Sequence, residues 1–142
     1  MAHHGTPDLL VLHERGVCLP THGPAVNVEH GISLVLQGSL GFDCGQEIRV
    51  GPGSIVLVPA GVPHRSLGGE DLTYWLVGFC GACHGFDESM PLMEPFARVR
   101  GGGLPVVGVD EARLDWVTRL FEELARESET PSGRSHHLLS LI

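Results

Sequence analysis

The sequence predicts a mainly β domain, a barrel or a sandwich, that is followed by two C-terminal helices. Residues 9–80 divide into short segments rich in β-branched and aromatic residues, separated by Gly, Pro or Asp clusters, as in all-β folds. From residue 109 the hydrophobic residues recur with the period of an α-helix instead. No helical pattern fits between the predicted strands, which excludes a parallel α/β sheet. The 142 residues, 42% of them hydrophobic, are enough for one compact domain.

Each predicted strand ends at a turn signal. Residues 43–46 (DCGQ) and 51–53 (GPG) have the composition of tight turns. Residues 84–105 show no clear period, so we expect an irregular segment there. The predicted strands span residues 9–13, 25–30, 32–38, 47–50, 54–59 and 72–79.

The first predicted helix covers residues 109–128. Asp110 is its N-cap candidate, and acidic residues follow in the first turn, where they complement the helix dipole. One stripe of this helix is apolar and should bury itself against the β domain; it comprises Leu114, Val117, Phe121 and Leu124.

A second helix is expected from Thr130-Pro131 to the last residue, because a cap residue followed by proline is typical of a helix start. Its end carries too many apolar side chains for one narrow buried stripe. An exposed apolar patch is unfavourable in a monomer, and two-fold pairing would cover it on both subunits. We therefore expect a homodimer whose interface includes Leu138, Leu139, Leu141 and Ile142.

Composition limits the partners. The formal net charge is −8 and all nine basic side chains are arginines spread along the chain, so no basic face is available to bind nucleic acid directly. No segment is apolar over the length of a membrane span, and the N-terminus lacks a signal-peptide pattern. These features favour a cytoplasmic location, where the four cysteines are expected to be thiols.

A motif around His64 indicates the type of β fold. Gly53, Pro59, Gly61 and His64 have the spacing that resembles the second conserved motif of cupins. The resemblance implies a cupin-like (double-stranded β-helix or jelly-roll) barrel in which His64 points into the mouth.

The remaining cupin metal ligands are not in place. If Gly38 closes the first motif, the glutamate position falls on Gly31, and the other ligand positions carry Ala25 and Asn27, or Pro24 and Val26. Glu29 and His30 are out of register, and alternation predicts Glu29 inward and His30 outward. One ligand of four does not hold a transition metal, so we expect no metal cofactor and no catalysis.

Most of the chain resembles the N-terminal domain of AraC-type transcription regulators, a cupin-like barrel without the metal. The resemblance rests on "ISLVLQGSLGF", "GSIVLVPAGVPHR" and "LTYWLVGFCG", and on the acidic helix pair that ends in "HLLSLI". It implies an effector-binding barrel with an N-terminal arm over residues 1–105 and a helical dimerisation segment over 106–142. In that family a helix-turn-helix domain follows directly, and DNA binding would need such a downstream domain. The alternatives are an isolated domain of a longer regulator and a natural effector-only protein, and the end of the sequence in an apolar helical run favours the first.

The family binds small effectors at inward-facing barrel positions, and Gln37, Ser66 and Glu29 share the inward parity of His64. The alternative for His64 is a turn histidine bonded to the backbone. Tyr74 and Trp75 face opposite sides of one strand, so one of them should line the pocket and the other should pack outside. The expected ligand-binding residues are His64, Gln37, Ser66, Glu29, Tyr74 and Trp75, together with Arg15 from the segment that resembles the family's arm, although a solvated arginine is the simpler reading.

The segment "CGACH" over residues 80–84 suits other chemistry. Cys80, Cys83 and His84 could bind zinc with Cys44 as fourth ligand, or the CxxC pair could be a redox site. The sequence around it shows no convincing helix start, which weakens the redox interpretation. Three hypotheses follow: an effector-binding regulator domain, which is favoured, a stand-alone metal-dependent cupin isomerase or dioxygenase, and a cysteine-based sensor.

Overall fold

A computed structural model describes residues 9–21 and 23–129. In this part of the chain, one six-stranded antiparallel sheet has the strand order β1-β5-β2-β4-β6, and β3 pairs with β2. Two short 3-10 helices, η1 and η2, lie between β5 and the first α-helix. The elements are β1 Leu9–Thr21, β2 His30–Asp43, β3 Glu47–Val50, β4 Ser54–Val58, β5 Arg65–Phe79, η1 Ala82–His84, η2 Pro91–Met93, α1 Glu94–Arg100, β6 Val106–Gly108 and α2 Glu111–Glu129.

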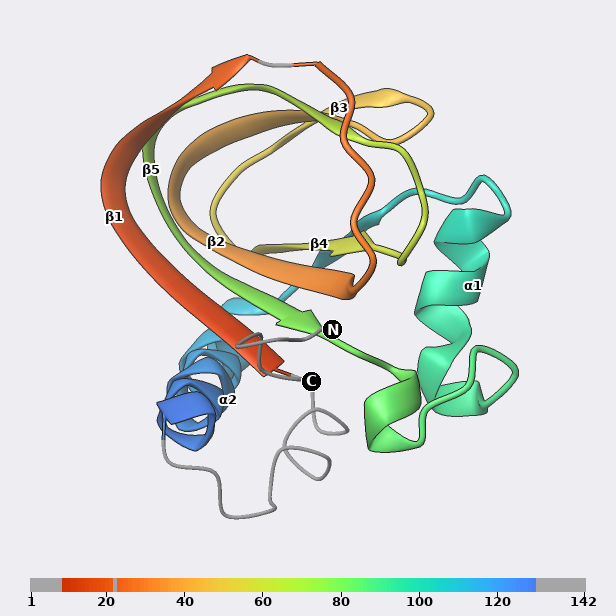
Figure 1. Ribbon diagram of the computed structural model, residues 1–142. Coiled ribbons are helices and arrows are strands. Elements are labelled where there is room, and N and C mark those ends of the chain that lie inside the picture. The colour runs from red at the N-terminus through yellow and green to blue at the C-terminus, as the bar shows by residue number, and fades with distance from the viewer. Residues whose placement is uncertain (1–8, 22, 130–142) are drawn as a thin grey trace.

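The sheet curls into the shape of an open barrel because its three long strands are bent. In Figure 1, β1, β5 and β2 curve together as nested arcs, and α1 and α2 lie outside them on opposite sides. The β2–β5 pairing has irregularities on both sides of Gln37, and such bulges increase the local bend and twist of a strand. Beyond the bulge, β2 continues into the tight turn 43–46 and pairs with β3. The barrel is mainly β and cupin-like, as the sequence predicts.

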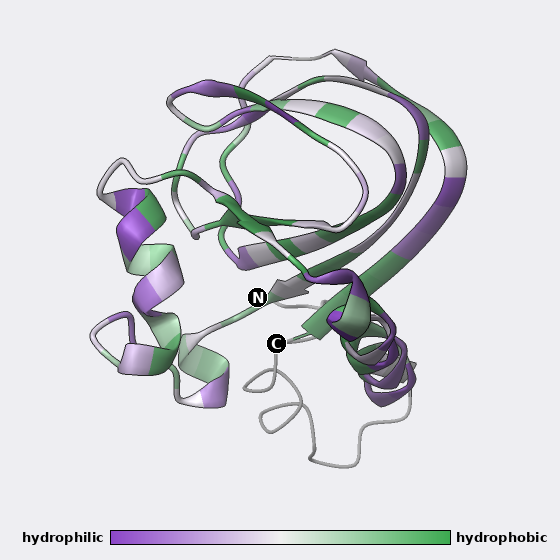
Figure 2. Cartoon of the chain, turned by 180° about the vertical axis from the view of Figure 1, so that it is seen from behind, coloured by the Kyte–Doolittle hydropathy of each residue, from purple (hydrophilic) through white to green (hydrophobic). Residues whose placement is uncertain are grey.

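The apolar stripe of α2 buries itself against the outer face of the sheet. Val117, Phe121 and Leu124 are buried, and the Phe121 ring lies 6.3 Å from that of Trp75. The side of α2 that faces away from the sheet is hydrophilic (Figure 2). Burial of each such side chain stabilises the fold by about 1.5–3 kcal/mol, which is what holds a helix with polar outer positions on the barrel.

A second apolar cluster lies on the inner face of the barrel. It contains Val35, Phe42, Val50, Val56 and Leu72, with Tyr74 packed against it. Residues adjacent in sequence to these, such as Leu34 and Ile55, belong to the outer cluster instead. The two faces of the sheet therefore both carry apolar side chains, which explains the nearly continuous apolar runs in β2 and β4.

Several sequence-based expectations need correction. Residues 25–29 form no strand, only a β-bridge between Ala25 and His64. Residues 9–21 form a complete strand paired with β5 and not a separate arm. The segment 84–105, expected to be irregular, contains η2 and α1, whose Phe96 and Val99 complete the outer core. The predicted first helix is α2, whereas the second helix and Leu138, Leu139, Leu141 and Ile142 lie outside the described residues.

No helix in the described part of the chain is long and apolar enough to cross a membrane.

Candidate functional site

Two rows of side chains cross the inner face of the barrel. Residues paired directly across antiparallel strands present their side chains on the same face. The pairings of β1, β5, β2 and β4 therefore place two sets of four residues side by side. The rows are Leu12–Leu76–Ser33–Val56 and Glu14–Tyr74–Val35–Ser54, and we call them the inner-face rows.

The inner-face rows are only partly shielded from solvent. Val35 and Val56 are buried, whereas Ser33, Tyr74 and Leu76 are half-buried. Small-molecule sites are usually lined by apolar side chains that remain partly accessible, together with a few polar groups. The inner-face rows have this composition.

The principal polar contact in these rows joins Tyr74 to Glu14. The Tyr74 hydroxyl donates a hydrogen bond of 2.8 Å to the Glu14 carboxylate. Burial, together with this hydrogen bond, raises the pKa of Tyr74 to about 12. At neutral pH the phenol is therefore protonated, and its oxygen lone pairs and the second Glu14 oxygen remain available as acceptors.

His64 lies at the end of the barrel beyond β4. Its backbone forms two hydrogen bonds with Ala25, of 2.7 and 3.0 Å, and its ring stacks on Phe42 at 5.7 Å between centroids. The ring Nδ1 lies 3.2 Å from the Val62 carbonyl oxygen, so the histidine is also fixed to its own turn. His64 thus packs on the inner face through its contact with Phe42 and is also bound to the backbone of its turn at Val62.

His64 borders a surface hollow of about 160 Å³ lined also by Pro24, Asp43, Gly45, Pro63 and Arg65. Arg65 lies 3.4 Å from the Asp43 carboxylate. Ser66 pairs with Phe42 and therefore lies on the same face, but its hydroxyl accepts the Gly68 N–H. His64, Ser66 and Tyr74 are thus all associated with the inner face.

Three other expected ligand residues lie elsewhere. The bulge shifts the alternation of β2, so that Leu40 and Phe42 pack on the inner cluster while Gln37 is exposed and donates to Asp71 at 3.0 Å. Trp75 is the member of its pair that packs outside: it is buried in the outer core with its ring stacked on His13 at 4.0 Å. Arg15 is exposed at an irregularity of β1.

His30 lies on the outer face of the sheet, as the alternation predicted, and is buried there beneath α1. His30 pairs with Phe79 of the outer core and the residue is only 7% exposed. Glu29 lies half-buried in the bend before β2, so the inward orientation predicted from a strand over residues 25–30 does not apply to it. The His30 ring contacts Phe79 and Phe96. Burial lowers the pKa of His30.

His30 is part of a polar cluster that the sequence analysis did not identify. Its Nδ1 accepts the Ala60 N–H at 3.0 Å, and its Nε2 lies 3.8 Å from the Glu88 carboxylate. Arg100 binds the same carboxylate with two hydrogen bonds of 2.9 and 2.7 Å and also donates to the Ala60 carbonyl. The Arg100 hydrogen bonds hold the pKa of Glu88 below its usual range. His30 and Glu88 are 58 positions apart in the sequence, and Glu88 and Arg100 are 12 positions apart. No local sequence pattern connects them, so only the fold reveals the cluster.

The inner face does not supply a cupin metal site. Gly31, at the glutamate position, pairs with Val58 and Gly78, and none of these three residues has a side-chain atom that can bind a metal. Among residues 9–21 and 23–129, no group of three or more His, Cys, Asp or Glu side chains is arranged to hold a metal ion. The donor set therefore does not fit a divalent transition metal at His64.

The expectation of free thiols is wrong for two of the four cysteines. Cys80 and Cys83 form a disulfide, whereas Cys18 and Cys44 are free. The zinc site proposed from Cys80, Cys83, His84 and Cys44 is not assembled in the described part. The 3-10 helix η1 begins between the two cysteines, a helix start that the sequence did not indicate.

Comparison with known proteins identifies the family. A family model described as the AraC-like ligand binding domain matches residues 10–142. Comparison with curated protein sequences found no significant match. The crystal structure of the AraC-like transcriptional activator CuxR has a TM-score of 0.61 at 13% identity, over 95% of this chain and 48% of that one. ToxT from Vibrio cholerae strain SCE256, with a bound unsaturated fatty acid, has a TM-score of 0.57 at 12% identity, over 94% and 50%.

At these identities the structural likeness shows the fold alone, and the chain spans about half the length of each of the two structures. The family match, in contrast, covers nearly the whole sequence. The chain belongs to the AraC-like ligand-binding domain family.

Proposed function

We propose that the chain is the effector-binding and dimerisation domain of an AraC-type transcription regulator, and that it senses a small organic molecule on the inner face of the barrel. The observation that supports this most is the Tyr74–Glu14 hydrogen bond on a half-accessible and mainly apolar wall. A polar pair in such a place can orient a ligand whose apolar part contacts Leu76 and Val35.

The charge and hydrogen-bonding capacity of the site favour a particular class of ligand. Glu14 is an anion, and the phenol proton of Tyr74 is already donated to it, so the pair offers acceptors. The chain has a net charge of −8. We infer that the effector is neutral or cationic and carries hydroxyl or amine donors beside an apolar part.

The mechanism is a shift of population. A ligand on the inner-face rows touches β1, β5 and β2 together, and so favours the closed arrangement of these strands over any arrangement in which β1 separates from β5. Within the described residues β1 pairs only with β5, and α2 contacts β1, so a change in the position of β1 would move α2 directly. Effector binding would reach the rest of the regulator by this route.

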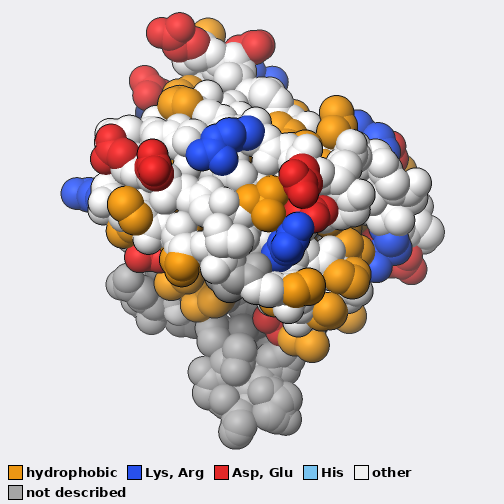
Figure 3. Space-filling view, turned by 90° about the horizontal axis from the view of Figure 1, so that it is seen from above, with side chains coloured by type: hydrophobic (Ala, Val, Ile, Leu, Met, Phe, Trp, Pro, Cys, Tyr) orange, Lys and Arg blue, Asp and Glu red, His pale blue; other side chains and the backbone are white. Residues whose placement is uncertain are grey.

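The domain acts by binding and not by catalysis, and it contacts DNA only through another domain. On the face shown in Figure 3, arginines and acidic side chains lie next to one another without a continuous basic area. We place dimerisation in the last residues of the chain, including Leu138 and Leu141, and the protein in the cytoplasm.

A thermal-shift screen with small alcohols, amines, sugars and aromatic compounds tests the proposal. A compound present at 100 times its Kd stabilises the fold by about 2.7 kcal/mol, which raises Tm by several degrees. The shift should be retained in Gln37→Ala, whose side chain is exposed and bound to Asp71, and lost in Tyr74→Phe. The same shift in both variants would place the site elsewhere.

A further inference from the structure

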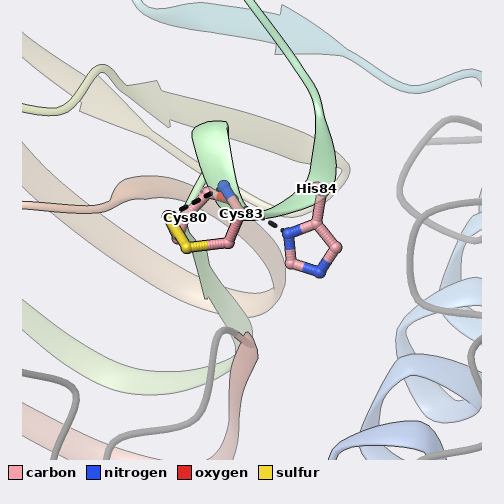
Figure 4. The surroundings of a disulfide bond; sticks show 3 residues. All are labelled: Cys80, Cys83 and His84. Atoms are coloured by element: carbon pink, nitrogen blue, oxygen red, sulfur yellow. Dashed lines mark hydrogen bonds between the residues drawn. A yellow bond between two sulfur atoms is a disulfide. The ribbon is translucent and has the colours of Figure 1, made fainter.

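The disulfide between Cys80 and Cys83 lies at the end of β5, where the strand leaves the barrel (Figure 4). Cys83 is exposed and Cys80 is half-buried. The Cys83 backbone N–H donates to the Cys80 sulfur at 3.1 Å, and the His84 ring lies beside the pair with its Nδ1 2.9 Å from the Cys80 carbonyl oxygen. The two sulfurs therefore differ in accessibility and in hydrogen bonding.

This difference defines the direction of thiol–disulfide exchange. An incoming small-molecule thiolate reaches the exposed Cys83 sulfur and forms a bond to it while the Cys80–Cys83 bond breaks. Cys80 leaves as a thiolate, which the Cys83 N–H stabilises through a charge-assisted hydrogen bond. A second thiolate then attacks the external sulfur of the mixed disulfide and releases Cys83. Two small thiols are oxidised to one disulfide, and the protein gains two electrons and two protons.

The loop closed by the disulfide packs directly on the His30 cluster. A Cβ placed on Gly81 would lie 3.2 Å from both Cδ2 and Nε2 of the His30 ring and 3.4 Å from the Phe86 carbonyl oxygen. His30 in turn accepts the Ala60 N–H, and the adjacent Gly61 N–H donates to Asn27 at 2.8 Å. A short sequence of contacts thus connects the CxxC loop to the rim loop over residues 59–64, which ends at His64.

We propose that Cys80 and Cys83 form a reversible redox switch that is opened by low-molecular-weight thiols at Cys83 and transmitted through Gly81 and His30 to the rim loop. In the cytoplasm, where we place the protein, disulfides are mostly transient and redox-sensing. This regulation goes beyond effector binding, and it can be measured in the absence of an effector.

The redox equilibrium is measured on the full chain with Cys18→Ser and Cys44→Ala, so that only the pair can react. The protein is equilibrated in glutathione buffers of varied composition, quenched with acid, alkylated with N-ethylmaleimide and weighed by mass spectrometry. We expect the number of labels to change from none to two along one curve, whether the equilibrium is approached from the oxidised or from the reduced protein. A folded protein that stays unlabelled in reduced glutathione, or stays labelled in oxidised glutathione, would overturn the switch.

The direction of attack is tested in the same background with one further substitution. Cys80→Ser should accumulate a glutathione adduct on the exposed Cys83. Cys83→Ser should form little or no adduct on the half-buried Cys80. Circular dichroism confirms that both variants are folded. Equal adducts in the two variants would contradict attack at Cys83.

Transmission to the rim loop is tested by amide NMR and hydrogen exchange of the oxidised and reduced protein. The Ala60 amide should change its chemical shift and exchange rate, whereas the Gly16 amide, bonded to Thr73 in another part of the sheet, should not. Gly81→Ala, which retains both thiols, should shift the Ala60 amide without reduction. An Ala60 amide that is identical in both redox states would refute the transmission, even if the pair reacts reversibly.

Discussion

Raising the pH should leave Tyr74 protonated well after an ordinary tyrosine has ionised. Its pKa is raised from 10.0 to about 12, because burial and the hydrogen bond to Glu14 both disfavour the phenolate. The chain contains one tyrosine, so the near-ultraviolet absorbance of tyrosinate reports Tyr74 alone. Titration of the folded protein should have its midpoint near 12, and titration in concentrated urea should return it to about 10.

The sign of the effect on stability follows from the direction of the shift. Because the folded pKa lies above the unfolded value, the contribution of Tyr74 is complete below pH 10 and is lost as the pH rises to about 12. Two pH units correspond to about 2.7 kcal/mol. Tyr74 is only half-buried and Glu14 is exposed, so solvent screening reduces this to about 1 kcal/mol.

Tyr74→Phe should therefore lower the free energy of unfolding by about 1 kcal/mol at neutral pH, since it removes one hydrogen bond. In the variant, the free energy of unfolding should not show the further decrease that the parent shows between pH 10 and 12. Glu14→Gln is the matched variant: it retains an acceptor without the charge and should lower the titration midpoint. A midpoint near 10 in the folded parent would refute the Tyr74–Glu14 hydrogen bond on the inner face.

Three further predictions concern the framework around the site. Phe121→Ala, which empties a fully buried position beside Trp75, should cost about 3–5 kcal/mol in urea unfolding, and a loss below 1 kcal/mol would contradict the docking of α2. Gly45→Ala at φ +97° meets no neighbouring atom and should cost about 1 kcal/mol. Gly38→Ala should cost several times more, because its Cβ would lie 2.3 Å from the Asp71 carbonyl oxygen; equal losses would be incompatible with this close approach. The pKa of His30 is lowered from 6.5, so its contribution to stability is present above that pH and is lost as the pH falls below it. His30→Asn should therefore flatten the dependence of the free energy of unfolding on pH below 6.5. An unchanged slope would argue against burial of the ring.

Patterns that depend on regular alternation were predictable from the sequence. The spacing of Gly53, Pro59, Gly61 and His64 indicated the barrel, and β3 and β4 occupy the predicted segments almost to the residue. The stripe of α2 that contains Phe121 was identified because a surface helix repeats its apolar positions with a fixed period. In each of these segments local sequence and tertiary packing favour the same structure.

Features that depend on tertiary packing or on the exact position of a bulge were not predicted. The burial of His30 depends on α1, whose Phe96 contacts its ring, and the exposure of Gln37 depends on the bulge at Gly38, which has a φ of +82°. The disulfide requires the chain to turn between Cys80 and Cys83, and the composition favoured thiols. The His30–Glu88–Arg100 cluster arises from three segments that meet only in the folded protein.

Methyl NMR of the protein with a compound selected by the thermal-shift screen tests the central claim most directly. Leu76, Val35 and Val56 carry methyl groups on the inner face, whereas Val77, Leu34 and Ile55 carry them on the outer face of the same strands. Binding on the inner-face rows predicts that the methyl resonances of Leu76, Val35 and Val56 shift on titration, while those of the outer set change little. Larger shifts at Val77, Leu34 and Ile55 than at the inner set would contradict effector binding inside the barrel.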